Sequence, residues 1–218
     1  MEEVIMIQIE NVTKKFGEAV VLDEINMELQ PGNIYGLVGR NGSGKTMLMK
    51  CICGFVLPTS GTIHVNGKIV GKEIDIPDDI GIIIENPGFL PNYSGFKNLQ
   101  LLAMIRNKIG KAQIKEAIRR VGLDPESKKH VGKYSLGMRQ RLGLAQALME
   151  DPSILLLDEP MNGLDNEGVE EIRKLILDLK QNGKLIIIAS HTREDINLLC
   201  DKVFYMDHGK IIQIEKKN

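Results

Sequence analysis

The stretch from Gly39 to Thr46 constrains this chain more than any other segment. It reads GRNGSGKT, follows the apolar run Ile34–Val38 and opens a helical segment at Lys45. Glycines let such a loop wrap around phosphate groups, and the helix that follows offers free backbone amides at its positive end. The order of strand, loop and helix, with the Lys-Thr pair in place, therefore predicts a site for a nucleoside triphosphate.

Each residue type in the loop suits one part of that ligand. The loop consists of Gly39, Arg40, Asn41, Gly42, Ser43, Gly44, Lys45 and Thr46. We expect its amides to contact phosphate oxygens, the Lys45 ammonium to reach the β- and γ-phosphates, and the Thr46 hydroxyl to bind Mg²⁺. The alternative is an ordinary glycine-rich turn, which the flanking strand and helix disfavour.

A second strand end supplies acids that fit this site. The apolar run Ile154–Leu157 is followed directly by Asp158 and Glu159. Beside a phosphate loop, Asp158 can ligate Mg²⁺, and Glu159 can accept a hydrogen bond from the attacking water as a general base. Without the loop, the same pair would more often be a solvated strand terminus.

A third acid, Glu85, also follows an apolar run, in the stretch GIIIENPGF that spans residues 81–89. Carboxylates are seldom fully buried without a partner, so Glu85 can simply mark the point where a strand meets water. It can also be directed at a metal or a phosphate. Its neighbours do not decide between the two interpretations.

Hydrophobic periodicity divides the chain into three parts, which we expect to form one α/β domain over residues 1–218. Residues 1–87 are rich in short strand patterns and carry the phosphate loop, 88–150 show helical spacing, and 151–218 alternate strand and helix. The expected strands are Val4–Ile9, Val20–Leu29, Ile34–Val38, Thr62–Val65, Ile80–Ile84, Ile154–Leu157 and Leu185–Ala189, with a closing hairpin of Val203–Met206 and Lys210–Ile214. The expected helices are Lys45–Cys53, Gly95–Ile109, Lys111–Val121, Leu136–Met149 and Val169–Leu179.

Composition argues against several other functions. A formal net charge of -1 provides no global basic field for nucleic acid or an anionic membrane surface. The three cysteines fit neither a disulfide framework nor a metal-binding spacing, and we expect them to be small buried hydrophobic residues in a reducing cytosol. The first ten residues lack the positive charge of a signal peptide. No apolar run reaches the ~20 residues needed to span a bilayer, so any membrane role would require a span from another polypeptide.

Four further motifs, together with the phosphate loop and the Asp158 strand, resemble those of the ATP-binding subunits of ABC transporters. Tyr134–Arg141 (YSLGMRQR) resembles the signature motif, Asn162–Asp165 (NGLD) the D-loop, and Ser190-His191 the switch histidine. Lys15–Gly17 (KFG) occupies the place of the aromatic A-loop. The resemblance covers essentially the whole chain. It implies an α/β P-loop NTPase (RecA-like) core with an N-terminal antiparallel β subdomain and an inserted helical subdomain.

The resemblance implies roles for residues outside the loop. Ser135 and Gly137 would bind the γ-phosphate of ATP held by a second subunit, and Asp165 would lie at the interface between the two. His191 would contact the γ-phosphate and orient the water. Phe16 would stack on adenine, which needs an aromatic face and no hydroxyl. Without the resemblance, Ser135 and Asp165 would be read as helix caps, His191 as a structural residue and Phe16 as ordinary packing before a turn.

Glu85 departs from the family pattern, because it stands where the Q-loop glutamine is usual. Glutamate keeps an oxygen for Mg²⁺ or water but adds a negative charge and loses the amide donors. Glu85 is therefore a candidate for catalysis, for metal binding and for coupling to the membrane subunit. This glutamate, the proline turn after it and the variant Gly137–Arg141 resemble the branch of bacitracin-resistance and lantibiotic-immunity exporters.

The function that the resemblance implies is an ATPase that binds ATP and Mg²⁺ and drives transport, with GTP left open as a substrate. Its partners would be a transmembrane permease and a second copy in a head-to-tail homodimer, without nucleic acid, at the cytoplasmic face of the cell membrane. Export of an antimicrobial peptide would suit the branch. Motion would pass to the permease through Asn86–Leu102, where Phe89, Leu90 and Tyr93 are candidate contacts or, equally, packing residues.

Two other functions remain as alternatives. A soluble ABC-type ATPase acting on nucleic acid or ribosomes would resemble this chain in its motifs. The absence of a long heptad run between Lys45 and Ser135, and the presence of a single cassette, disfavour it. A nucleotide-binding regulator with little hydrolysis is disfavoured by Glu159 and His191.

Overall fold

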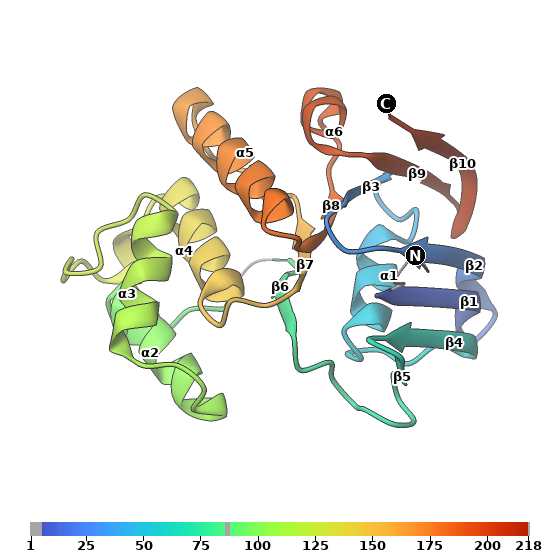
Figure 1. Ribbon diagram of the computed structural model, residues 1–218, viewed down its shortest axis with the longest axis horizontal. Coiled ribbons are helices and arrows are strands. Elements are labelled where there is room, and N and C mark those ends of the chain that lie inside the picture. Colours follow the sequence, from blue (N-terminus) through green and yellow to red (C-terminus); the bar gives the residue numbers. More distant parts are fainter. Residues whose placement is uncertain (1–5, 86–87, 218) are drawn as a thin grey trace.

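The computed structural model, which describes residues 6–85 and 88–217, contains a four-stranded and a six-stranded β-sheet (Figure 1). The strands are β1 (Ile7–Phe16), β2 (Ala19–Leu29), β3 (Ile34–Val38), β4 (Ser60–Val65), β5 (Lys68–Ile69), β6 (Ile80–Ile83), β7 (Ile154–Asp158), β8 (Leu185–Ala189), β9 (Lys202–Asp207) and β10 (Lys210–Lys216). The helices are α1 (Lys45–Ile52), α2 (Gly95–Arg106), α3 (Lys111–Arg120), α4 (Leu136–Leu148), α5 (Asn166–Gln181) and α6 (Arg193–Leu199), with a 3-10 turn at Val131–Lys133.

The larger sheet determines where the phosphate loop and the acidic strand ends lie. Its strand order is β10-β9-β3-β8-β7-β6, and all neighbouring pairs are parallel except the edge pair of β9 and β10. All residues of β8 are buried, as expected for a parallel strand covered on both faces. Because the carboxyl ends of parallel strands meet at one edge, the segments that follow β3, β6 and β7 lie together there.

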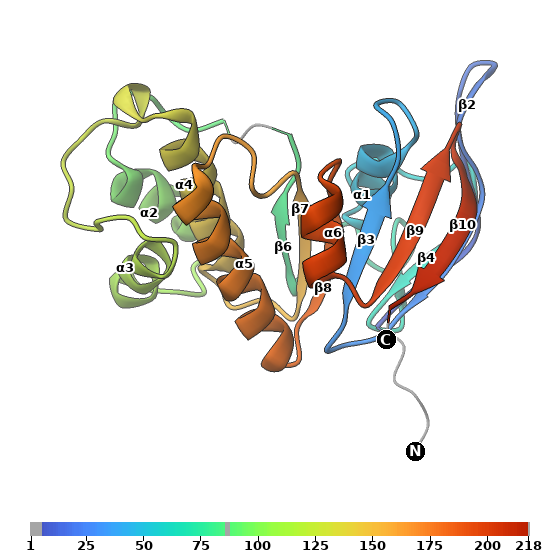
Figure 2. The same cartoon turned by 90° about the horizontal axis from the view of Figure 1, so that it is seen from above.

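Alternate residues of β8 enter two separate hydrophobic cores. Ile186 and Ile188 join the core that contains α5, α6 and the helices α2 to α4. Leu185 and Ile187 join the core that contains α1 and the smaller sheet, whose strand order is β2-β1-β4-β5. Figures 1 and 2 show α1 between the two sheets. Truncating a buried side chain such as that of Ile187 to alanine would lower the free energy of unfolding by about 2–5 kcal/mol. Packing of this kind in both cores holds the strand ends in place.

The helices α2, α3 and α4 pack together on the far side of β6 (Figure 1). A hydrogen-bonded turn precedes α2, where Ser94 caps the helix by accepting from the backbone N–H of Lys97. The buried side chain of Asn98 accepts from the N–H of Leu90 at 2.7 Å and donates to the carbonyl oxygens of Leu90 and Tyr93 at 3.1 and 3.4 Å. Asn98 thereby fixes the backbone of residues 90–94, directly before and at the start of α2.

The expected fold class is confirmed, and the differences lie in individual elements. Strand β1 extends to Phe16, beyond the expected end at Ile9. Register shifts after Ile9 and Val12 interrupt the alternation of buried residues, so the sequence pattern ended the expected strand too early. Helix α6 was not expected, because its seven residues carry too few apolar positions for a helical pattern and depend on tertiary packing. The expected strand start at Val4 and the turn at residues 86–87 lie outside the described residues. The three-part division of the domain stays a prediction.

The burial of the three cysteines leads to a first prediction. Cys51, Cys53 and Cys200 are free and buried, and burial raises the pKa of Cys51 to about 11 and those of Cys53 and Cys200 to about 12. Since the thiolate is the reactive form, we expect the native protein to react far more slowly with Ellman's reagent at about pH 8 than the chain unfolded in guanidinium. Absorbance of the released thiolate measures both rates, and rapid labelling of the native protein would contradict the burial.

Candidate functional site

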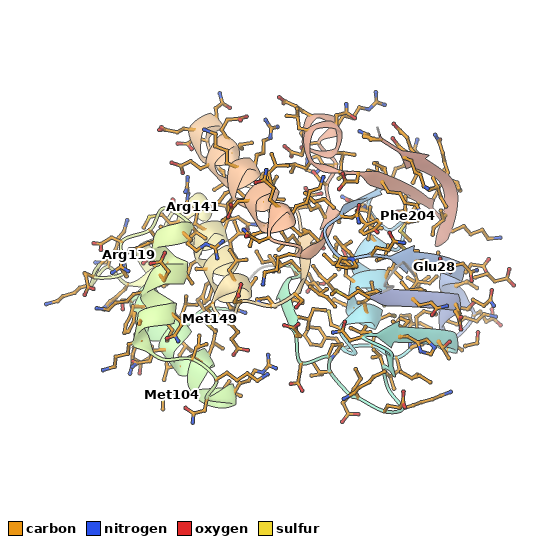
Figure 3. The ribbon with its side chains drawn as sticks, in the orientation of Figure 1. Glu28, Met104, Arg119, Arg141, Met149 and Phe204 are labelled. Atoms are coloured by element: carbon orange, nitrogen blue, oxygen red, sulfur yellow. The ribbon has the colours of Figure 1, made fainter. Side chains whose placement is uncertain are left out.

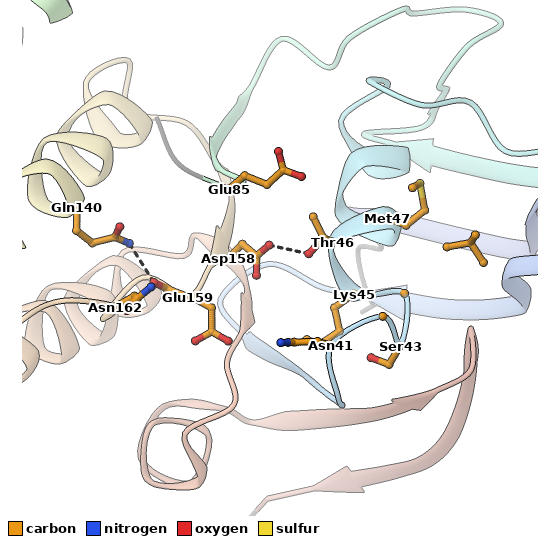
Figure 4. Close-up of a pocket in the computed structure, with 13 residues that line it drawn as sticks. Asn41, Ser43, Lys45, Thr46, Met47, Glu85, Gln140, Asp158, Glu159 and Asn162 are labelled. Carbon is orange, nitrogen blue, oxygen red and sulfur yellow. Dashed lines mark hydrogen bonds between the residues drawn. The ribbon is translucent and has the colours of Figure 1, made fainter. Parts of the chain in front are cut away.

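A cavity of about 540 Å³ lies at the edge of the larger sheet where β3, β6 and β7 end. The predicted loop residues Asn41–Thr46 line one side of it, and Asp158 and Glu159 line the other (Figure 4). Glu85 reaches the same cavity from the end of β6. The structure therefore brings together the residues that three separate motifs in the sequence predicted.

Close packing around the loop explains its first glycine and the position of its lysine. A Cβ atom at Gly39 would lie 2.3 Å from the carbonyl oxygen of Met206, so no larger residue fits there. The buried Lys45 donates from Nζ to the carbonyl oxygens of Gly39 at 2.7 Å and Arg40 at 3.1 Å. These bonds hold the ammonium inside the loop, next to the positive end of α1, where an anion is stabilised.

The hydroxyl of Ser43 provides independent support for a phosphate ligand. Among the described residues, it is the single fully buried side-chain oxygen or nitrogen without a hydrogen-bond partner. Burying a hydroxyl in this way costs roughly 1–3 kcal/mol, and natural proteins rarely leave that cost uncompensated. Because Ser43 lines the cavity within the loop, a phosphate oxygen is the partner that this hydroxyl fits.

The hydroxyl of Thr46 and the carboxylate of Asp158 meet across the cavity. Thr46 Oγ1 donates to Asp158 Oδ2 at 2.8 Å, which joins the first turn of α1 to the end of β7 (Figure 4). Both groups are hard oxygen donors of the kind that Mg²⁺ prefers. Within residues 6–85 and 88–217, no three His, Cys, Asp or Glu side chains converge as a metal site. The hydroxyl of Thr46 and the carboxylate of Asp158 would supply two of the ligands of Mg²⁺, and phosphate and water the others.

Glu159 is held by its backbone in a conformation that few glutamates adopt. Its φ angle of 49° lies in the left-handed region, which often marks functional residues in non-glycine positions. Its N–H donates to the carbonyl oxygen of Ala189 at 2.8 Å, and its own carbonyl oxygen accepts from Nε2 of the buried Gln140 at 3.0 Å. Glu159 Oε1 also lies 2.8 Å from Nδ1 of His191. A carboxylate fixed in this way can accept a proton from water.

Some of the predicted site residues lie outside the cavity of their own chain. They are Phe16, Gly39, Arg40, Ser135, Gly137, Asp165 and His191. Ser135 and Asp165 cap α4 and α5, with side-chain oxygens that accept from the backbone N–H groups of Met138 at 3.1 Å and Gly168 at 2.9 Å. The alternative reading of both residues as helix caps is confirmed, while their roles at a second nucleotide stay predictions.

Phe16 lies at the end of β1 with 52% of its surface exposed. Lys14 Nζ is 4.8 Å from the centroid of the ring. An exposed ring beside a cation is available to stack on a base, and its exposure weakens the alternative of ordinary packing.

A buried ion pair that sequence patterns did not indicate joins two of the predicted segments. Arg173 on α5 donates from Nε and Nη2 to Oδ1 of Asp195 on α6, at 2.9 and 2.6 Å, and both side chains are buried. Burial lowers the pKa of Arg173, but the hydrogen bonds that its guanidinium donates to Asp195, Glu194 and Glu170 outweigh this effect and raise the pKa above its usual value. Since α5 follows Asp165 and α6 follows His191, this pair fixes the two segments relative to each other. Contacts between separate helices leave no local signal in a sequence.

Comparison with known sequences finds close relatives. The sequence profile of the ABC transporter family matches residues 22–162. The chain is 46% identical over 211 residues to YybJ of Bacillus subtilis (strain 168), an uncharacterized ABC transporter ATP-binding protein, and covers 97% of both chains. It is 42% identical over 210 residues to the bacitracin transport ATP-binding protein BcrA of Enterococcus faecalis, covering 95% of this chain and 68% of BcrA. It is 37% identical over 212 residues to the lantibiotic transport ATP-binding protein SrtF of Streptococcus pyogenes, covering 97% and 91%.

Solved structures share the fold. A dimeric, post-hydrolysis ATP-binding cassette, MJ0796 bound to ADP and Pi, superposes with a TM-score of 0.86 at 23% identity, covering 97% of this chain and 98% of that chain. The cbiO1 protein from Clostridium perfringens, part of the ABC transporter complex cbiONQ, superposes with a TM-score of 0.83 at 28% identity, covering 97% and 88%.

The relatives named for bacitracin and lantibiotic transport also confirm the branch that Glu85 and the signature variant predicted.

The geometry around Glu159 leads to a second prediction. Glu159→Gln keeps the size of the side chain but removes its basicity, so we expect turnover to fall by about 100-fold or more. Binding of ATP should persist, because the loop and Lys45 are unchanged. Phosphate release and the fluorescence of a bound ATP analogue measure the two effects. Glu116→Gln, at an exposed position on α3, is the control, and turnover near the wild-type rate in Glu159→Gln would exclude this residue as the base.

Proposed function

Since this chain belongs to the ABC transporter family, as an ATP-binding subunit that hydrolyses ATP to power transport, we propose that it drives export of an antimicrobial peptide through a separate membrane permease. The hydrogen bond between Thr46 and Asp158, which closes the phosphate loop against the Glu159 strand end, is the observation that carries the ATPase chemistry. The named roles of BcrA and SrtF in bacitracin and lantibiotic transport support the class of cargo.

In the proposed reaction, the residues of one chain bind the triphosphate and activate water. The loop amides, the Ser43 hydroxyl and Lys45 hold the phosphates. Thr46 and Asp158 hold Mg²⁺, which would neutralise charge that develops on the phosphates. Glu159 accepts a proton from the attacking water. His191 keeps the Glu159 carboxylate in place, because its Nδ1 lies 2.8 Å from Glu159 Oε1. The same histidine would contact the γ-phosphate.

A second copy of the chain completes each site. Gly137 lies in the first turn of α4 and Ser135 caps that helix; Ser135 and Leu136 are exposed and do not line the cavity of their own chain. A hydroxyl and free amides at the start of a 13-residue helix form a suitable site for an anion. We place them on the γ-phosphate held by the partner, with Asp165 at the interface, in a head-to-tail homodimer.

The permease would contact the segment that leads from Glu85 into α2. Leu90 and Tyr93 are exposed there, although Asn98 holds their backbone firmly, whereas Phe89 packs against the helical core. Met104 projects into solvent near the end of α2 (Figure 3). None of the helices within residues 6–85 and 88–217 has both the length and the apolar character needed to cross a bilayer. We propose a position at the cytoplasmic face of the membrane, where ATP is available to the site.

A third prediction concerns the dimer. In the presence of Mg²⁺ and ATP, Glu159→Gln protein should form a dimer, because two nucleotides are trapped between two copies and are not hydrolysed. Light scattering coupled to size-exclusion chromatography measures the mass. Adding Ser135→Arg to Glu159→Gln should abolish the dimer, whereas a strictly monomeric Glu159→Gln protein at high concentration would contradict the shared site.

A fourth prediction concerns the permease. Purification of the tagged chain from detergent-solubilised membranes should recover a protein with several membrane spans. Leu90→Asp should reduce that recovery, because a charge in an apolar contact is costly. The control is Leu57→Asp, since Leu57 and Leu90 are both 48% exposed and Leu57 lies near the smaller sheet. Recovery with nucleic acid in place of a membrane protein would support the non-transport alternative.

A further inference from the structure

The glutamate that stands in the place of the usual glutamine has a cationic partner in this chain. Glu85 Oε1 lies 2.6 Å from Nζ of Lys50. Lys50 follows Thr46 by one helical turn in α1, so the two side chains lie on the same face of that helix. Figure 4 shows the Glu85 carboxylate turned toward α1, beside the pair formed by Asp158 and Thr46. The ion pair therefore adjoins the proposed Mg²⁺ ligands.

The backbone of Glu85 resembles that of Glu159. Ile83 pairs with Leu157 in the parallel sheet, so Glu85 and Glu159 each follow the paired residue by two positions. Both have a positive φ angle, of 61° and 49°. A glutamate persists in this conformation where its surroundings hold it there, and the described contact that holds the Glu85 side chain is the one with Lys50.

The charges around the cavity explain why this contact matters. Glu85, Asp158 and Glu159 bring three carboxylates to one cavity. Lys45 is engaged by the loop carbonyls, whereas Lys50 neutralises Glu85 directly. A free carboxylate is a good ligand for Mg²⁺, but a carboxylate paired with an ammonium must leave that partner before it can ligate the metal.

The Lys50 and Glu85 side chains are exposed enough for their ion pair to break when a ligand binds. The Glu85 side chain is 64% exposed and that of Lys50 is 26% exposed. Exposed ion pairs contribute modestly to stability and exchange readily. The Glu85 carboxylate is therefore accessible to a cation that arrives with the nucleotide.

We propose that Lys50 is a positioning residue that holds Glu85 at the rim of the cavity and competes with Mg²⁺ for its carboxylate. Nucleotide bound with Mg²⁺ draws Glu85 away from Lys50. A glutamine at position 85 would form no such ion pair. The inference rests on the proposed Mg²⁺ site.

The test is the Mg²⁺ dependence of nucleotide binding at equilibrium, without turnover. A fluorescent, non-hydrolysable ATP analogue is titrated with MgCl₂ in the presence of wild-type, Lys50→Met, Glu85→Gln and doubly substituted protein. Lys50→Met should lower the Mg²⁺ concentration at half-maximal binding by about two- to fivefold, as expected for the loss of a partly exposed ion pair. In the Glu85→Gln background, Lys50→Met should leave that concentration unchanged.

Two further variants separate this effect from general damage. Lys50→Arg keeps the ion pair and should behave like the wild type. Lys115→Met removes a comparable ion pair on α3, far from the phosphate loop. Lys115 Nζ lies 2.6 Å from Glu126 Oε1, and the two side chains are 34% and 66% exposed. This variant should also behave like the wild type.

Three outcomes would overturn the inference. They are a wild-type midpoint for Lys50→Met, a higher midpoint, and a shift of equal size with Glu85 and with Gln at position 85. A wild-type chain that binds nucleotide equally well without Mg²⁺ would instead overturn the Mg²⁺ site itself, which distinguishes failure of the premise from failure of the Lys50 role.

Discussion

The hydrogen bond between Thr46 and Asp158 joins two positions that are 112 residues apart in the chain, and the rest of the site is arranged around it. One partner lies in the first turn of α1, which is buried between the two sheets, and the other ends β7, which pairs with β6 and β8 in the larger sheet. Neither can move without disturbing a packed core. The ordinary burial of aliphatic side chains thus fixes the phosphate loop beside Asp158 and Glu159.

Further contacts connect this point to the elements around it. Glu85, paired with Lys50, leads to the segment that Asn98 fixes against α2. Asp165 begins α5 and His191 precedes α6, and the buried pair of Arg173 and Asp195 ties those two helices together. These contacts join the site to the helical part of the domain and to the segments that precede α5 and α6.

Local motifs allowed much of the fold and of the site to be predicted. The phosphate loop, the Asp158-Glu159 strand end and the two helix caps each depend on residues close together in sequence, and the structure brings the loop and the strand end to one cavity. The contacts of Lys50 with Glu85 and of Arg173 with Asp195 could not be predicted, because each depends on how separate elements pack. Helix α6 was missed for the same reason, and the β1 extension because bulges hide the alternation of buried residues.

One chain holds only part of the proposed catalytic site, and complementation between two inactive variants tests this most directly. Lys45→Ala removes the phosphate lysine, and Ser135→Arg blocks the surface offered to the partner's nucleotide, so each homodimer should be inactive. In an equal mixture, half of the dimers should be mixed, each with one intact site, and ATPase activity should recover to about one quarter of the wild-type value if sites act independently. A mixture that stays as inactive as its components, or a Ser135→Arg protein that is active alone, would contradict the shared site.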